Sequence, residues 1–134
     1  MTQTPAPPLT RDVAGLAGLF LTSGVTHLVK PEVFEPLVPR ALPVRREIVY
    51  LSGIAEVVCA AGLLHPRTRR AAGWASAALL VVVFPGNVQM SVNHGKRASR
   101  RQDASSRAAF AGTLARLPLQ VPLVRAALRA AGRV

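Results

Sequence analysis

The residues best suited to chemistry are polar side chains inside four otherwise apolar stretches. Each stretch carries one set: Ser23 and His27; Ser52, Glu56 and Cys59; Asn87, Ser91 and His94; Thr113, Arg116 and Gln120. Residues three or four positions apart lie on the same face of a helix, so each set would line one side of its helix. Glu56 and Arg116 are opposite charges far from the ends of their stretches. Apolar surroundings favour pairing of such charges.

The polar sets also lie at similar distances from the charged residues that begin their stretches, and so at a similar depth in the bundle. At about 1.5 Å per residue, Glu56 lies roughly 15 Å from Arg46, and Arg116 lies roughly 13 Å from Arg107. The sequence therefore predicts one buried ligand-binding site. Glu56 and Arg116 would pair at its centre, Asn87 and Gln120 would satisfy their remaining hydrogen bonds, and His27 would lie at its mouth. The alternative is that the pair is structural and fixes the register of the helices.

The elements that must position this site are long and apolar. The central one, Ala71–Met90, is an uncharged run closing on Pro-Gly-Asn. At about 20 residues it can cross a hydrocarbon core of roughly 30 Å. Half of the chain is hydrophobic, at 50%, and these residues come in blocks separated by charges. We therefore predict an all-α fold, an integral membrane four-helix bundle with helices over residues 12–29, 45–64, 70–93 and 106–131.

The three segments that connect the predicted helices differ in length and composition. Residues 31–43 hold four prolines, and a spanning helix cannot pass through them. We predict a short helical turn lying in the membrane interface, with an ordinary loop as the alternative. His65-Pro66-Arg67 would form a tight hairpin turn, and the basic segment 94–107 is predicted to be a solvated loop. Pro85, and Pro118 with Pro122, should bend the third and fourth helices.

The chain ends and small residues complete the domain prediction. Residues 1–10 are polar and proline-rich and are predicted to be a disordered tail, whereas residues 11–134 form a single domain. The tail has no basic residue and lacks the first part of a signal peptide, so the first helix is expected to be retained. Small residues, among them Gly15, Gly18, Gly53 and Gly62, would let helices approach closely, within one bundle or in a homodimer.

Composition argues against several classes of function. The net charge is +11, but only 4% of residues are aromatic, which leaves little for stacking on nucleic-acid bases. Lys and Arg flank the apolar blocks, where they would meet anionic lipid headgroups, so the expected partner is the bilayer and not nucleic acid. The single cysteine, Cys59, cannot form an internal disulfide. His27 with His94 would be too few ligands for a metal, and no metal site is predicted.

Several of these residues also occur together in a known pattern. The elements are His27 and Pro31, Pro39 and Pro43, Ser52-Gly53 with Glu56, Leu63-Leu64 with Pro66, Pro85 with Asn87, and the run Arg116-Leu117-Pro118-Leu119-Gln120. In this order, from Gly15 to Val124, the sequence resembles the DoxX family of small bacterial membrane proteins. The resemblance implies a four-helix membrane bundle. It also implies that Glu56, Asn87, Arg116 and Gln120 are motif positions.

The resemblance suggests functions without fixing one. DoxX takes its name from a subunit of a thiosulfate:quinone oxidoreductase, so the first hypothesis is an accessory or structural subunit of a membrane redox assembly, without activity alone. The alternative is a protein that binds or converts a small apolar molecule, such as a quinone, isoprenoid or sterol-like lipid, at the polar site. A transporter or proton path is a third. No resident cofactor is identifiable, and the expected location is the plasma membrane, crossed several times.

Overall fold

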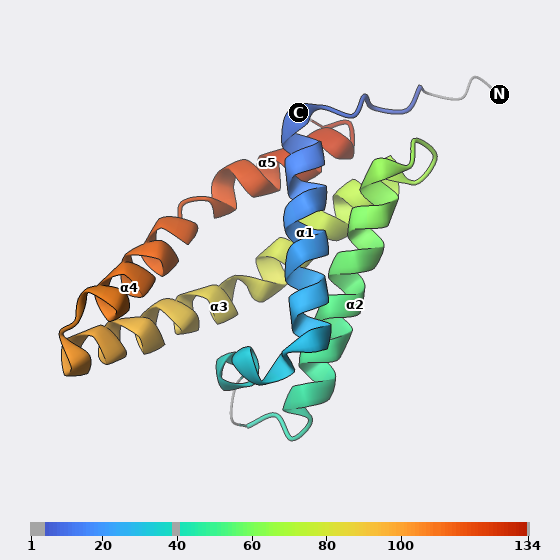
Figure 1. The fold of residues 1–134 in the computed structure, drawn as a ribbon. Helices are drawn as coiled ribbons and strands as arrows, with labels where there is room; N and C mark the ends of the chain where they lie inside the picture. Colours follow the sequence, from blue (N-terminus) through green and yellow to red (C-terminus); the bar gives the residue numbers. More distant parts are fainter. Residues whose placement is uncertain (1–4, 39–40, 134) are drawn as a thin grey trace.

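The computed structural model describes residues 5–38 and 41–133. The elements are α1 (Arg11–Val29), the 3₁₀ turns η1 (Pro31–Val33) and η2 (Glu35–Leu37), α2 (Arg45–Leu64), α3 (Arg69–Arg101), α4 (Ala104–Arg116) and α5 (Gln120–Ala130) (Figure 1). No strand occurs in these two ranges, and the all-α prediction is confirmed.

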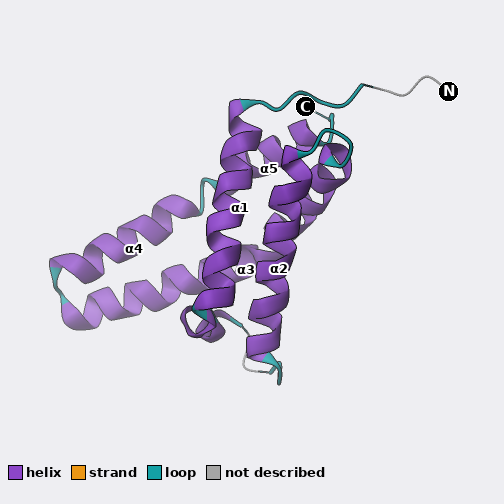
Figure 2. Cartoon of the chain, turned by 45° about the vertical axis from the view of Figure 1, so that its right-hand side comes forward, coloured by secondary structure: helices purple, strands orange, loops and turns teal. Residues whose placement is uncertain are grey.

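The helices form a packed part and a projecting part. α1 and α2 run side by side in opposite directions, α3 packs against α2 and α5, and α5 reaches back to α1. α4 packs mainly against α3, and Figure 1 shows the α3–α4 hairpin extending obliquely away from the α1–α2 pair. The turned view in Figure 2 shows the same projection. The helices therefore diverge on one side of the molecule.

Three helices, α1, α2 and α3, are long and apolar enough to cross a membrane. With 19 and 20 residues, α1 and α2 are close to the roughly 30 Å thickness of a hydrocarbon core at about 1.5 Å per residue. α3 has 33 residues and is longer than such a core. Many large apolar side chains on these helices face outward; Val58 is 64% exposed and Val82 73%.

The predicted bounds hold for α2, and α1 begins one residue earlier than predicted, but the end of the third helix is wrong. α3 starts at Arg69 and continues through His94 to Arg101, so most of the expected basic loop is helical. Lys, Arg and Ala are strong helix formers, and their charge alone does not end a helix. Gly95 supports the extension because a Cβ there would lie 2.9 Å from the Phe110 ring of α4. α3 ends at Arg101, and its C-cap residue Gln102 has a φ of 52°.

Asp103 starts α4 at the tip of the hairpin. Its Oδ1 accepts a hydrogen bond from the Ser106 backbone N–H at 2.7 Å. Bonds from the Ser106 hydroxyl and backbone N–H hold the pKa of the Asp103 carboxyl below its usual 3.8. This cap is therefore charged at neutral pH, the form that best satisfies the free N–H groups of a helix start.

Replacing Asp103 by Ala is expected to lower the hydrogen-exchange protection of the Ser106 and Arg107 amides. Because the folded pKa is lowered, the stabilising effect is present well above pH 3.8 and is lost as the pH falls through the folded pKa. The difference in protection between wild type and variant should therefore shrink in acid. Equal protection factors at pH 7 would contradict the role of the cap.

The predicted fourth helix is divided into α4 and α5. Pro118 has no backbone N–H, and the turn around it is closed by bonds between residues three apart, from Leu117 to Leu114 and from Gln120 to Leu117. Pro122 falls in the first turn of α5, where its missing N–H needs no partner. The sequence therefore indicated a bend, and the structure has a break.

Small residues set the spacing of the helices, though not all those expected. A Cβ at Gly73 of α3 would lie 2.4 Å from the Ala131 nitrogen and 2.6 Å from the Ala127 carbonyl oxygen, so α3 and α5 touch through their backbones. Gly62 lies similarly close to Ala72. Gly15 and Gly18 have open space around them, so they make no close contact between helices of this chain, and their predicted use in a homodimer stays a prediction.

Arginine side chains link the helix ends on the side of the bundle opposite the Pro-rich segment. Arg69 is buried and donates to the carbonyl oxygens of Leu63 at 2.7 Å, Leu64 at 3.1 Å and Pro7 at 2.6 Å. The predicted tail includes residues 1–4, which lie outside the described residues, but Pro7 is buried against the helices. Arg129 pairs with Asp12 at 3.2 Å.

Candidate functional site

A cavity of about 1110 Å³ lies between α1, α2, α3 and the junction of α4 with α5. The η1 and η2 turns lie over part of it, and the predicted Pro-rich turn is thus a pair of 3₁₀ turns; Pro39 and Arg40 of this segment lie outside the described residues. All the predicted site residues line this one cavity: His27, Glu56, Asn87, Arg116 and Gln120. The five residues therefore lie around one space, and their role in binding a ligand stays a prediction.

Two glycines bring the polar residues of α1 and α2 together. A Cβ on Gly24 would lie 2.7 Å from the Gly53 carbonyl oxygen, and a Cβ on Gly53 would lie 2.9 Å from the Gly24 carbonyl oxygen. Gly24 precedes His27 by three residues, and Gly53 precedes Glu56 by three, so each polar side chain lies about one turn from the contact. The close approach of the backbones thus sets the His27–Glu56 distance.

Glu56 is buried, at 5% exposure, and its carboxyl group lies beside the His27 imidazole. The His27 Nδ1 atom lies 3.3 Å from Glu56 Oε2 but only 2.6 Å from the Ser23 carbonyl oxygen. One ring nitrogen carries at most one proton, and the shorter distance assigns it to Ser23. Accordingly, Glu56 Oε2 has no hydrogen-bond donor among the described residues.

The predicted direct pair between Glu56 and Arg116 does not form. Among the described residues, no Arg116 nitrogen lies within 4.0 Å of a Glu56 oxygen. Both side chains line the cavity, Glu56 from α2 and Arg116 from the end of α4. The reason is the break after Arg116, which ends α4 and leaves the guanidinium on a helix that packs on α3 and not on α2.

Gln120 and Asn87 also differ from their predicted roles. Gln120 donates from Nε2 to the Leu80 carbonyl oxygen at 3.0 Å and so links α5 to α3. Its partner lies in the turn before Pro85, where the missing proline N–H leaves the Val81 carbonyl without its helical donor. Asn87 lines the cavity without a side-chain hydrogen bond to the described part of the chain.

Phe34 is a site residue that the sequence did not indicate, and Ser23, which belongs to the predicted polar set of the first helix, had no predicted role. The Phe34 ring stacks on the His27 imidazole, with ring centres 3.8 Å apart and planes at 14°. Through this stack the Pro-rich segment holds the imidazole against the cavity wall. The repeated spacing Gly24-x-x-His27 and Gly53-x-x-Glu56 was a signal for the α1–α2 contact, whereas no local pattern marked Phe34.

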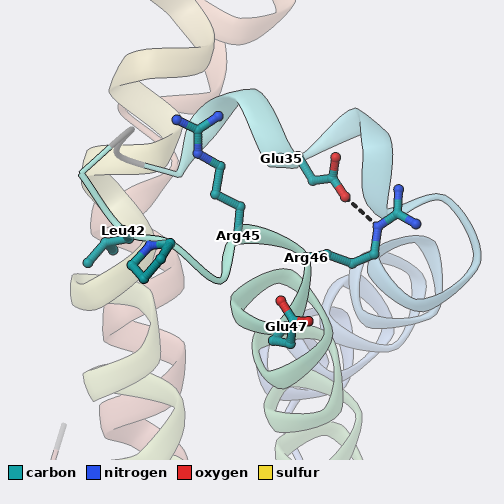
Figure 3. A pocket seen from close by; sticks show the side chains of 6 residues that line it. Glu35, Leu42, Arg45, Arg46 and Glu47 are labelled. Carbon is teal, nitrogen blue, oxygen red and sulfur yellow. Dashed lines mark hydrogen bonds and ion pairs between the residues drawn. The ribbon is translucent and has the colours of Figure 1, made fainter.

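A second, shallower pocket of about 540 Å³ adjoins this region at the start of α2 (Figure 3). It shares Glu35, Leu42 and Arg45 with the large cavity. Arg46 donates from Nε to Glu35 Oε1 at 2.6 Å, and Figure 3 shows this pair joining η2 to α2. The ion pair thus fastens the segment that covers the cavity. Because both side chains are partly exposed, its energetic contribution is small.

The cavity wall combines polar and charged groups with an apolar surface. Besides the five predicted residues, its polar lining includes Ser23, Glu32, Glu35, Arg45, Ser52, Gln89, Asn93 and Lys96, and its apolar lining includes Leu19, Phe20, Val49, Leu80, Val83 and Leu123. Within residues 5–38 and 41–133, no group of His, Cys, Asp and Glu is arranged to hold a metal ion. Cys59 packs in the apolar core.

Comparisons with known proteins give a family but no activity. Residues 16–131 match the family described as "Domain of unknown function (DUF8561)". No curated protein matches the chain. No solved structure matches it either.

Proposed function

We propose that this chain, which belongs to the DUF8561 family, is an integral membrane protein that binds an amphiphilic small molecule in its helical cavity. The observation that carries the proposal is the buried Glu56 side chain, which lines a cavity of about 1110 Å³ and whose Oε2 has no hydrogen-bond partner among the described residues. A buried acceptor without a donor is costly, and a bound polar head would remove that cost. The mostly apolar wall would hold the rest of the molecule.

Three helices that are long and apolar enough to cross a membrane support the membrane part of this proposal. We assign α1, α2 and α3 as crossings and α4 with α5 as a fourth, interrupted crossing, which gives the four-helix membrane bundle expected from the sequence. The interruption at residues 117–119 lies between Arg116 and Gln120, both of which line the cavity. Non-helical backbone at membrane depth is tolerated where it faces protein or a polar cavity. The proposed location is the plasma membrane.

A cavity-filling substitution tests binding. Val83 of α3 lines the cavity, whereas Val81, two residues earlier, is 62% exposed and does not line it. Native mass spectrometry of protein extracted from membranes in mild detergent should find a small molecule on wild type and on Val81→Trp. The same mass should be lost from Val83→Trp, because the indole would occupy its space.

Two patterns of adduct binding would contradict the proposal. The same adduct on both Trp variants would place the molecule outside the cavity and contradict the proposal. An adduct on none of the three samples, with all folded, would also contradict it. The mass of a cavity-dependent adduct would give its chemical class.

The accessory-subunit hypothesis from the DoxX resemblance stays a prediction and is the second candidate. The observation that favours it is the α3–α4 hairpin, which packs mainly on itself and leaves Val92 and Leu114 exposed. A membrane partner could cover this hairpin. It would then co-purify in a fixed ratio with wild type and be lost when Val92 and Leu114 are replaced by Asn.

A further inference from the structure

We infer that the tip of the α3–α4 hairpin, residues 96–107, binds the phosphate headgroups of anionic phospholipids. The inference concerns a surface outside the cavity, and it rests only on the membrane part of the proposed function. The tip holds one acid, Asp103, and five cations, all of them exposed: Lys96, Arg97, Arg100, Arg101 and Arg107.

Four of these cations lie on one face of the last turns of α3. Lys96 and Arg100 are four residues apart, as are Arg97 and Arg101, so the members of each pair are neighbours on the helix surface. The other side of α3 meets α4, because Gly95 lies against the Phe110 ring and Ala98 is buried. Like charges at this spacing repel one another, and an anion bound between them would remove the repulsion.

The tip cations have no counter-charge within the described part of the chain. Among residues 5–38 and 41–133, no carboxylate oxygen lies within 4.0 Å of any of the five. The Asp103 carboxylate is used to cap α4 at Ser106. At the opposite end of the bundle, four arginines are engaged on carbonyl oxygens, a carboxylate or an aromatic ring: Arg69, Arg70, Arg129 and Arg133. The tip cations therefore differ in being available to an anion outside the chain.

The tip also lies where phospholipid headgroups would be. The uncharged stretch of α3 ends at Met90, and the cations that follow are costly to place in hydrocarbon. Figure 1 and Figure 2 both show the tip to one side of the α1–α2 pair and near the level of η1 and η2, where α1 ends. Because α1 has about the length of one crossing, this level corresponds to a membrane surface.

The chemistry of the tip favours lipid over nucleic acid. An anionic leaflet attracts Lys and Arg near its surface without needing any other contact. Residues 96–107 include no aromatic side chain that could stack on a base. The expected partner is therefore the anionic headgroup of a lipid in the same membrane.

Competition between phosphatidylglycerol and phosphatidylcholine tests the inference. The full chain in mild detergent is given both lipids in equal amounts, and native mass spectrometry counts those retained. Wild type should retain phosphatidylglycerol over phosphatidylcholine by about tenfold or more, since each cation near an anionic surface contributes about a factor of five. The preference should decrease as salt is added. Equal retention of the two lipids by wild type would overturn the inference.

Two matched variants locate the contact. Replacing Arg97, Arg100 and Arg101 together by Gln should reduce the preference by about tenfold or more, and Gln keeps the helix because it is a good helix former. Replacing three exposed arginines outside the hairpin by Gln removes the same charge and should keep the preference: Arg11, Arg67 and Arg125. A preference that the hairpin substitutions leave unchanged, or that both variants lose alike, would overturn the inference.

Two further samples test the chemistry of the partner. Replacing Arg97, Arg100 and Arg101 by Lys keeps the charge and should keep the preference for phosphatidylglycerol, because the attraction depends on charge. Loss of the preference in this variant would overturn the inference. A single-stranded DNA oligonucleotide is also added to wild type with bound phosphatidylglycerol. Displacement of the lipid by an equal amount of the oligonucleotide would assign the tip to nucleic acid and would overturn the inference as well.

Failure here and failure of the proposed function can be told apart. Val83→Trp should lose the cavity adduct and keep the preference for phosphatidylglycerol, because Arg97, Arg100 and Arg101 do not line the cavity. Loss of the preference in Val83→Trp would place the lipid in the cavity and overturn this inference. An absent preference beside an intact cavity adduct would remove the hairpin contact and leave the proposed function in place.

Discussion

Replacement of Arg69 by Met should lower the free energy of unfolding by about 3 kcal/mol or more, because three carbonyl oxygens lose a charged donor in a buried place. Two of these carbonyls, on Leu63 and Leu64, belong to the last turn of α2, which has no helical donors of its own. The third, on Pro7, fastens the segment before α1. One side chain thus holds the ends of α1, α2 and α3 together. Unfolding by denaturant in detergent micelles, followed by Trp74 fluorescence, measures the loss.

The matched control is Arg67→Met, two residues earlier in the same turn. Arg67 is exposed, so its replacement should leave the unfolding midpoint nearly unchanged. Arg69→Lys should fall between the two, because a compact ammonium keeps the charge but cannot reach three separate carbonyls as the planar guanidinium does. If Arg69→Met and Arg67→Met unfold alike, the bonds at this end of the bundle add little to stability.

The apolar cores of the helices were predictable, and their polar extensions were not. α2 has the predicted bounds, since charges mark its start and His65-Pro66 marks its end. Hydropathy could not show that α3 continues beyond Asn93, because its last residues are polar yet favour helix. Nor could periodicity distinguish a bend from a break at Pro118. That outcome depends on how α5 packs against α3 through Gly73.

The sequence indicated which residues lie around the cavity, but it did not indicate which of them contact one another. Helical spacing placed His27, Glu56 and Arg116 on inward faces, and all line one cavity. Which of them touch depends on the distances between helices, and these depend on contacts across the bundle. Gly24 and Gly53 let the backbones of α1 and α2 come into contact, and this brings Glu56 next to His27 rather than next to Arg116.

That dependence makes Gly24→Leu the substitution with the largest expected effect on the site. A Cβ there would lie 2.7 Å from the Gly53 carbonyl oxygen and 2.8 Å from Val57 Cγ2, and the carbonyl cannot rotate away as a side chain can. α1 and α2 must then separate, at a cost of about 3 kcal/mol or more in unfolding free energy. The His27–Glu56 contact of 3.3 Å should open. The unfolding midpoint and the cavity-dependent adduct are measured on the same sample.

Gly18→Leu is the matched control, because Gly18 lies on the same helix with nothing near its missing Cβ. It should retain both the wild-type midpoint and the adduct. Equal stability of the two variants would mean that α1 and α2 tolerate separation, and the glycine contact would then not hold the fold. If Gly24→Leu is less stable but keeps the adduct, the contact serves the fold alone. If Gly24→Leu loses both stability and the adduct, ligand binding depends on the spacing of α1 and α2. The backbone contact that packs α1 on α2 would then also position His27 and Glu56.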